Sequence, residues 1–140
     1  MQSYVSLGHE EAVLATEAIR SELSRRGRVA AIAVADAHGE LISLVRLDGA
    51  PLGSIRIAAN KAFTAARERR PTREIGQAAR DAETGFDISY YGDPRYVGWG
   101  GGLPVVVEGS VAGSVAVSGL PELEDMELAA IGVAAITAHG

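Results

Sequence analysis

The sequence predicts an α+β domain with three layers (α/β/α), in which helices cover both faces of a central antiparallel sheet. Two observations carry this prediction. Two pairs of short apolar segments are each joined by a tight turn, which is typical of antiparallel hairpins. Segments with helical apolar spacing precede, separate and follow these hairpins, and this order favours helices layered on a sheet. The length of 140 residues suits one domain over residues 1–140.

The first half of the chain predicts a helix, a hairpin and a second helix. Ser6 is a plausible N-cap of the first helix, and Gly27 follows its end. The small apolar run after Gly27 is typical of a strand covered on both faces. The segment Asp36–Gly39 is a turn signal, and Ser54 can cap the next helix. The expected elements are a helix over 7–26, strands over 29–35 and 41–47, and a helix over 54–69.

The second half predicts a short helix, an irregular segment, another hairpin and a terminal helix. Pro71 stops the preceding helix, and Glu108–Gly109 is the turn of the second hairpin. A fifth strand is expected at about Tyr96–Trp99. The other elements are a helix over 72–85, strands over 103–108 and 110–118, and a helix from Pro121 whose apolar stripe is Leu123, Met126, Ala130, Val133 and Ile136.

Composition and charge exclude several classes of function. The net charge of −5 argues against nucleic-acid binding, which needs a basic footprint. The chain has no cysteine, hence no disulfide or thiolate chemistry. No apolar run is long enough to span a membrane, and the N-terminus lacks the plan of a signal peptide, so a cytoplasmic location is expected. The basic cluster over residues 67–73 is either a solvated helix end or a source of cations for a ligand.

Four segments of the sequence, taken together, resemble one known family. They are V-A-D-A-H-G-E-L, the run R-L-D-G-A-P-L-G-S-I followed by N-K-A-F-T-A, G-G-G-L-P-V, and G-S-V-A-G-S-V-A-V-S-G followed by E-D. On these residues the chain, from about Leu7 to Ala135, resembles the GlcG/HbpS family, also called the haem-degrading domain family. The same domain occurs at the C-terminus of PduO-type corrinoid adenosyltransferases.

This resemblance implies a profilin-like fold with a five-stranded antiparallel sheet. It also implies a tetrapyrrole ligand, haem or a corrinoid, and assembly into dimers or larger homo-oligomers. The chain departs from the family pattern at Leu120–Pro121, where glycine usually follows Ser118–Gly119, and in the many tyrosines of the segment 85–102. Both departures border the expected ligand site.

Charged residues at the exit of the first hairpin are the first candidates for ligand binding. Arg46 and Asp48 flank this exit, and Asp48 either caps backbone donors in a turn with Gly49 or faces a ligand cavity. In the following helix, Lys61 stands among alanines and shares a face with Thr64. Lys61 either reaches solvent, pairs with Asp48, or meets a ligand carboxylate or phosphate.

The segment 85–102 holds most of the aromatic residues and adds Tyr91, Trp99 and Gly102 to the candidates. Long loops in compact domains are usually functional or disordered, and aromatic residues argue against disorder. The glycine triad 100–102 lacks the lysine of a P-loop, which favours close approach of the backbone to a ligand or a strand over nucleotide binding. Ser118, at the end of a strand of small residues, completes the ligand-binding set.

Metal ligation and nucleophilic catalysis find little support. His9 could ligate haem iron or cobalt, or it is a solvated helix histidine. Glu124 and Glu127 have the spacing of a cation-binding pair, but acidic residues in a first helical turn need no metal. No histidine accompanies a nucleophile elbow, so a Ser-His-Asp triad is not favoured.

The leading hypothesis is a small-ligand-binding protein with a tetrapyrrole, haem or corrinoid, as its ligand. The alternative is an enzyme that acts on a small polar catabolic metabolite by acid/base chemistry at an Asp48/Lys61 pocket. A third possibility is an assembly protein without a ligand. At least a homodimer is expected, because the aromatic residues of the segment 85–102 are of the kind enriched at interfaces.

Overall fold

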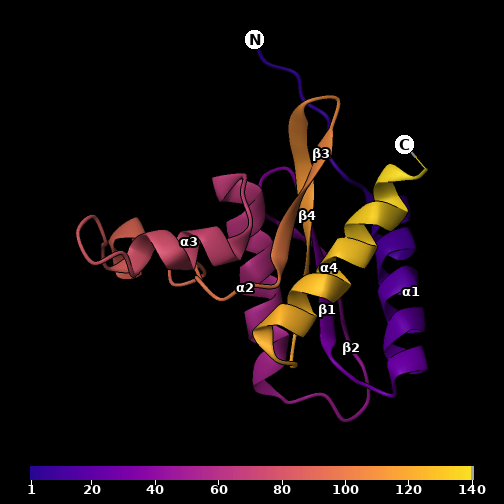
Figure 1. Cartoon of the computed structure of the whole chain (residues 1–140). Helices are drawn as coiled ribbons and strands as arrows, with labels where there is room; N and C mark the ends of the chain where they lie inside the picture. The colour runs from indigo at the N-terminus through magenta and orange to yellow at the C-terminus, as the bar shows by residue number, and fades with distance from the viewer. Residues whose placement is uncertain (140) are drawn as a thin grey trace.

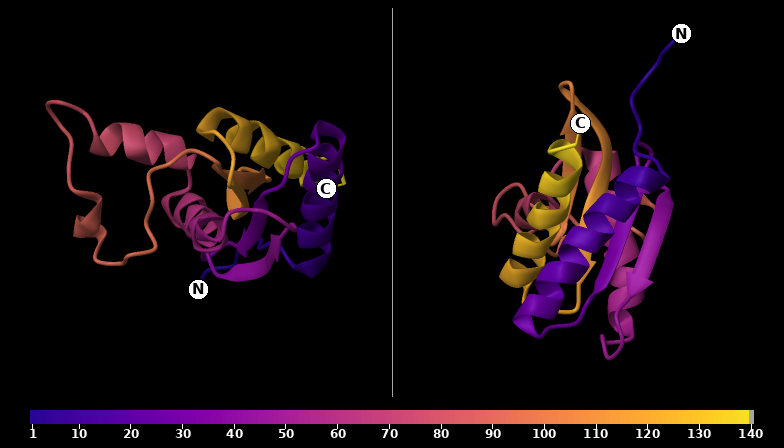
Figure 2. Two further views of the ribbon diagram at one scale, coloured as in Figure 1. Left: turned by 90° about the horizontal axis from the view of Figure 1, so that it is seen from below. Right: turned by 90° about the vertical axis from the view of Figure 1, so that its right-hand side faces the viewer.

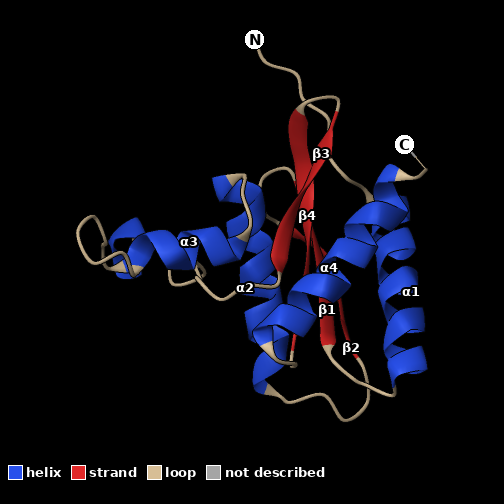
Figure 3. Ribbon diagram, in the orientation of Figure 1, coloured by secondary structure: helices blue, strands red, loops and turns tan. Residues whose placement is uncertain are grey.

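The computed structural model describes residues 1–139 of the chain. Figures 1 and 3 show how its helices and strands are arranged. In chain order they are α1 (His9–Arg26), β1 (Ala31–Asp36), β2 (Leu41–Arg46), α2 (Gly53–Glu68), α3 (Thr72–Ala79), the short 3₁₀ helix η1 (Ile88–Tyr91), β3 (Gly102–Val107), β4 (Ser110–Ser118) and α4 (Glu122–Thr137).

The sheet has four antiparallel strands in the order β2-β1-β4-β3. Both predicted hairpins are present, and β1 and β4 form the middle of the sheet. Ile32 and Val34 of β1 pack into the core with α1 and α4, whereas Ala33 and Ala35 face Ala62 of α2. The right-hand view of Figure 2 shows α1 and α4 side by side over one face. The predicted three layers are therefore confirmed, and β1 is buried on both faces.

The predicted fifth strand was wrong. Residues 96–99 form no strand, because the side chain of Thr64 in α2 takes backbone hydrogen-bonding groups of this segment. Thr64 Oγ1 accepts a hydrogen bond from the Val97 N–H at 3.0 Å and donates one to the Arg95 carbonyl at 3.2 Å. These groups would otherwise have been free to pair with a strand. The segment 80–101 runs instead as a loop with η1, and together with α3 it projects from the rest of the fold (Figure 1).

Three predicted helix boundaries were also wrong, and at each one a serine or aspartate side chain takes a partner other than the predicted one. Helix α1 begins at His9 with Gly8 as its N-cap, and Ser6 Oγ accepts the N–H of Ala37 instead of capping the helix. Ser54 lies inside α2 and donates to the Pro51 carbonyl. Helix α3 ends at Ala79, and the Asp81 carboxylate then accepts the N–H groups of residues 83 and 84, an alternative to helical bonds.

The face that α4 buries differs from the predicted stripe. Leu123 and Ala130 are exposed, whereas Leu128, Ala129 and Gly132 are buried with Asp125 and Ile136. The absence of a side chain at residue 132 explains this choice. A Cβ there would lie 2.6 Å from Ile19 Cδ1 of α1 and 2.8 Å from Val115 of β4. Within residues 1–139, no helix combines the length and apolarity that crossing a bilayer requires.

Candidate functional site

A buried ion pair joins α2 to the start of α4. Lys61 and Asp125 are each 2% exposed. Lys61 Nζ donates to Asp125 Oδ2 at 3.1 Å and to the Val117 carbonyl of β4 at 3.0 Å. The other carboxylate oxygen of Asp125 accepts the Leu120 N–H at 3.2 Å. The pair therefore connects a helix on one face of the sheet, the end of a central strand and a helix on the other face.

The sequence predicted close approach of the backbone at the glycine triad to a ligand or a strand, and in the structure the triad lies against β4 and this ion pair. A Cβ on Gly101, whose φ is +126°, would lie 2.8 Å from Lys61 Nζ and 2.7 Å from the Val117 carbonyl oxygen. A Cβ on Gly100 would lie 2.7 Å from Glu122 Oε1, which accepts the Gly100 N–H at 2.8 Å. The glycine backbone is thus packed against residues of α2, β4 and α4.

Burial disfavours the charged form of both partners. It lowers the pKa of Lys61, and the Asp125 carboxylate partly offsets this effect. Burial also raises the pKa of Asp125 to about 6, although the Lys61 ammonium and the Leu120 N–H act in the opposite direction. Perturbed groups of this kind gather at functional sites, because a site needs groups that change protonation near neutral pH.

This pair lies in the wall of a pocket of about 300 Å³. Trp99 and Ile57 supply apolar surface, while Lys61, Asp125 and Ser118 supply polar groups. The complete lining consists of Ile57, Lys61, Trp99, Gly100, Ser118, Gly119, Leu120, Glu122 and Asp125. The pocket therefore combines an aromatic wall with a buried cation, a hydroxyl and two acidic residues, Asp125 and Glu122, and we call it the Lys61 pocket.

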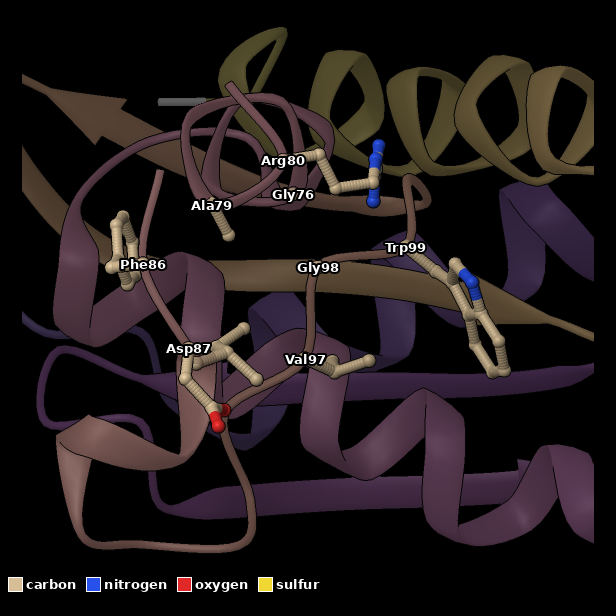
Figure 4. Close-up of a pocket in the computed structure, with 9 residues that line it drawn as sticks. Gly76, Ala79, Arg80, Phe86, Asp87, Val97, Gly98 and Trp99 are labelled. Carbon is tan, nitrogen blue, oxygen red and sulfur yellow. The ribbon is translucent and has the colours of Figure 1, made fainter. Parts of the chain in front are cut away.

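A second pocket, of about 340 Å³, lies between α3 and the loop that follows it. Figure 4 shows its residues. Phe86 and Val97 line it, Arg80 lies at the end of α3, and Trp99 lies in the loop before β3. Gly76 and Gly98 both line it, and their backbones pack so closely that a Cβ on Gly76 would clash with the Gly98 carbonyl oxygen. We call it the Arg80 pocket. Trp99, which is 57% exposed, lines both pockets.

Three of the sequence-predicted residues come together in the Lys61 pocket: Lys61, Trp99 and Ser118. Arg46 and Asp48 are exposed and line neither of the two pockets. Lys61 pairs with Asp125 and not with Asp48, so the acid/base pair considered from the sequence is replaced by a different one.

Thr64, Tyr91 and Gly102 hold neighbouring backbone and side chains in place. Gly102 starts β3, and its N–H donates to Thr72 Oγ1 at 3.0 Å. The Tyr91 hydroxyl donates to Glu68 Oε1 at 2.8 Å, and its ring stacks on Tyr96 at 4.2 Å between centroids. Thr64 fixes the loop before Trp99 through the two hydrogen bonds described above. None of the three lines either pocket, and their contacts hold the segments on both sides of Trp99 in place.

His9 is exposed and lies on the first turn of α1. Among residues 1–139 no group of three or more His, Asp or Glu side chains is placed to hold a metal ion. The cation-binding spacing of Glu124 and Glu127 has another explanation here, since both carboxylates contact Arg26, at 3.4 Å and 3.1 Å.

Sequence reasoning missed Asp125 and the Arg80 pocket. Asp125 stands among the acidic residues of the first turn of α4, which the helix dipole explains without any buried role. The signal that identifies it is its helical spacing with Leu128, Ala129 and Gly132, the face that α4 buries. No comparable signal marks the Arg80 pocket, because loop residues form most of it.

Comparisons with known proteins agree with this architecture. A family model described as "Haem degrading protein HbpS-like" matches residues 7–134. GlcG of Escherichia coli K12 is 33% identical over 118 residues, which are 84% of this chain and 85% of that protein.

Two solved structures are similar over most of the chain. A double mutant of HbpS from Streptomyces reticuli is 30% identical with a TM-score of 0.83, over 96% of this chain and 88% of that one. The PduOC:heme complex is 25% identical with a TM-score of 0.85, over 94% of this chain and 95% of that one.

Proposed function

Because the chain belongs to the HbpS-like family, we propose that it is a small-ligand-binding protein whose ligand is a tetrapyrrole, haem or a corrinoid. A solved relative is a heme complex, which supports this ligand class. The observation that carries the proposal is Trp99, a half-exposed indole that lines both pockets. A flat aromatic surface of this kind stacks well on a macrocycle.

The residues around Trp99 fit the faces and edges of such a ligand. Phe86, Val97 and Ile57 offer apolar contacts on the two sides of the indole. Arg80 and Lys61 bring one cation to each pocket, and cations pair with the carboxylate arms of haem. With pocket volumes of about 340 Å³ and 300 Å³, neither pocket alone is large, so we place the macrocycle across Trp99.

The lining of the two pockets contains no histidine, methionine or tyrosine within the described residues. Stacking and charge pairing therefore provide the affinity, and the pockets themselves offer none of these usual axial ligands to the metal. It follows that iron-free protoporphyrin should bind about as well as hemin.

The single tryptophan of the chain reports on this site directly. Titration with hemin, protoporphyrin and cobalamin should quench its fluorescence saturably for at least one of the three, with a Soret shift for hemin. Trp99→Ala removes the fluorophore, so binding to the variants is followed by the absorbance of the ligand. The substitution should weaken binding by roughly 5- to 150-fold, since stacking of one aromatic ring contributes about 1–3 kcal/mol. The matched control is Tyr4→Ala, because Tyr4 is 59% exposed, nearly the same as Trp99, and lines neither pocket. Equal binding by both variants, or no saturable binding at micromolar concentrations, would contradict the proposal.

A further inference from the structure

The Lys61 pocket is already built around one carboxylate, that of Asp125. An ammonium group has three N–H donors. Within the part of the chain that the structure describes, Lys61 uses two of them, on Asp125 Oδ2 at 3.1 Å and on the Val117 carbonyl at 3.0 Å. One donor is left for a ligand that enters from the pocket, and a second becomes free if Asp125 gives up its charge.

The other charged groups near Asp125 have their own partners. Glu122 lies 3.7 Å from Arg73 and accepts the Gly100 N–H. Glu124 contacts Arg28 at 3.1 Å and Arg26 at 3.4 Å. Glu122 also favours the charged form of Lys61 from a greater distance, but Asp125 is the carboxylate that contacts the ammonium and is its main counter-ion.

The rest of the lining suits a small polar molecule. The pocket of about 300 Å³ lies at the lower end of the range for small-molecule sites, so it admits a compact ligand and not a whole macrocycle. Ser118 is 5% exposed and adds a hydroxyl to the same lining, while Trp99 and Ile57 cover an apolar part.

We propose that the Lys61 pocket binds the carboxylate of a small organic acid on Lys61 and Ser118, and that Asp125 releases the cation by taking up a proton from solvent. The incoming carboxylate replaces the Asp125 carboxylate in the contact with Lys61. The charge of the pair is thereby kept, because the protonated Asp125 is neutral. The inference extends the proposed function without requiring it, since a free hydroxy acid and a propionate arm of haem carry the same group.

Two measurable consequences follow. Burial raises the pKa of Asp125 to about 6. Above that pH a ligand carboxylate must displace an ionised Asp125 from Lys61, whereas below it Asp125 is already neutral. Binding should therefore be tighter at pH 5.5 than at pH 7.5. At pH 7.5, close to one proton should be taken up for each carboxylate bound.

Calorimetric titration with lactate, which is ionised throughout this pH range, tests both consequences. Measurements in two buffers of different ionisation enthalpy give the number of protons taken up. Asp125→Asn keeps an oxygen for the Leu120 N–H and should bind lactate more tightly at pH 7.5, without proton uptake. The double variant Lys61→Met/Asp125→Asn should lose roughly 10- to 150-fold in affinity relative to Asp125→Asn, the range expected for one hydrogen bond to a charged group. Asp93→Asn is the control, because it removes one negative charge from an exposed pair with Arg95.

Lactate binding without proton uptake, or equal affinity in all variants, would overturn the proposal, as would absence of saturable binding. Competition then identifies the source of the carboxylate. If saturating lactate weakens hemin binding and haem dimethyl ester binds poorly, the propionate arm occupies the pocket. If hemin and lactate bind independently, the ligand is a free acid. Binding of lactate with no binding of any tetrapyrrole would refute only the function proposed above.

Discussion

Replacement of Lys61 by methionine tests how the buried pair contributes to stability. The side chains of Lys61 and Asp125 are each 3% exposed, so the methionine variant leaves a carboxylate in the interior without its cation. Removal of one partner of a buried pair costs about 3–5 kcal/mol. For a domain of this size, each kcal/mol lowers the melting temperature by about 2–4 °C, so a fall of about 6–20 °C is expected.

The cost should depend on pH with a defined sign. Without the cation, the pKa of Asp125 rises further above the value of about 6 that burial already gives it. Below that pKa the folded variant holds a neutral acid and the penalty shrinks. Between the ordinary pKa of an aspartate and this raised pKa, the folded state binds more protons than the unfolded state, so stability falls as pH rises. Above the raised pKa the full penalty applies. Lys61→Met should thus lose more stability, relative to the unaltered protein, at pH 8 than at pH 5.

Urea denaturation at these two pH values measures the effect, with Arg20→Met as the control. Arg20 contacts Glu17 at 2.9 Å, but the side chains are 49% and 59% exposed, so its removal should matter far less. The double variant Lys61→Met/Asp125→Leu should recover most of the lost stability, since an apolar pair of similar volume replaces two desolvated charges. Lys61→Met with the same midpoint as Arg20→Met at pH 8 would refute the reasoning.

Further expectations concern the backbone and the assembly. Gly101→Ala should cost about 1–3 kcal/mol more than Gly109→Ala in urea denaturation. Both residues have positive φ, but only the new Cβ at 101 meets a backbone carbonyl, at 2.7 Å. Thr64→Val should cost about 1–3 kcal/mol and speed amide exchange in residues 93–99, because the loop loses its partner in α2; unchanged exchange would mean that the loop is held elsewhere. We also expect a homodimer through the exposed aromatic residues Tyr90 and Trp99; light scattering should show a mass above the monomer that falls in the double serine variant, and a monomeric unaltered protein would disprove it.

The parts of the fold that local chemistry determines could be predicted from the sequence. Both hairpins follow from turn residues between apolar runs, and the buried stripe of α1 follows from Ala15, Ile19 and Leu23 at helical spacing. The fifth strand could not be excluded, because nothing local shows that Thr64 takes the backbone groups of residues 95 and 97. The same holds for the buried face of α4, which depends on contact between Gly132 and Ile19 of α1.

The candidate site was predictable only in part, for a related reason. Lys61 is conspicuous because a charged residue stands in a face of alanines that must pack on a sheet. Its partner Asp125 stands beside acidic residues that a first helical turn explains equally well. The choice between Asp48 and Asp125 depends on how α2 and α4 meet across the end of β4, which only the tertiary structure shows.

The energetics of the pair also bear on its role. Burial disfavours the charged form of both Lys61 and Asp125, so an apolar pair in the same place would serve stability at least as well. Stability alone therefore gives no reason for two charges at this point of the fold. A pocket that must bind a carboxylate does give one, because it needs a buried cation, and a cation without ligand needs an internal counter-ion. If the double apolar variant is as stable as the unaltered protein and yet does not bind lactate, the pair is present for binding. If the apolar variant is much less stable, the pair is structural, and the carboxylate site must be sought elsewhere.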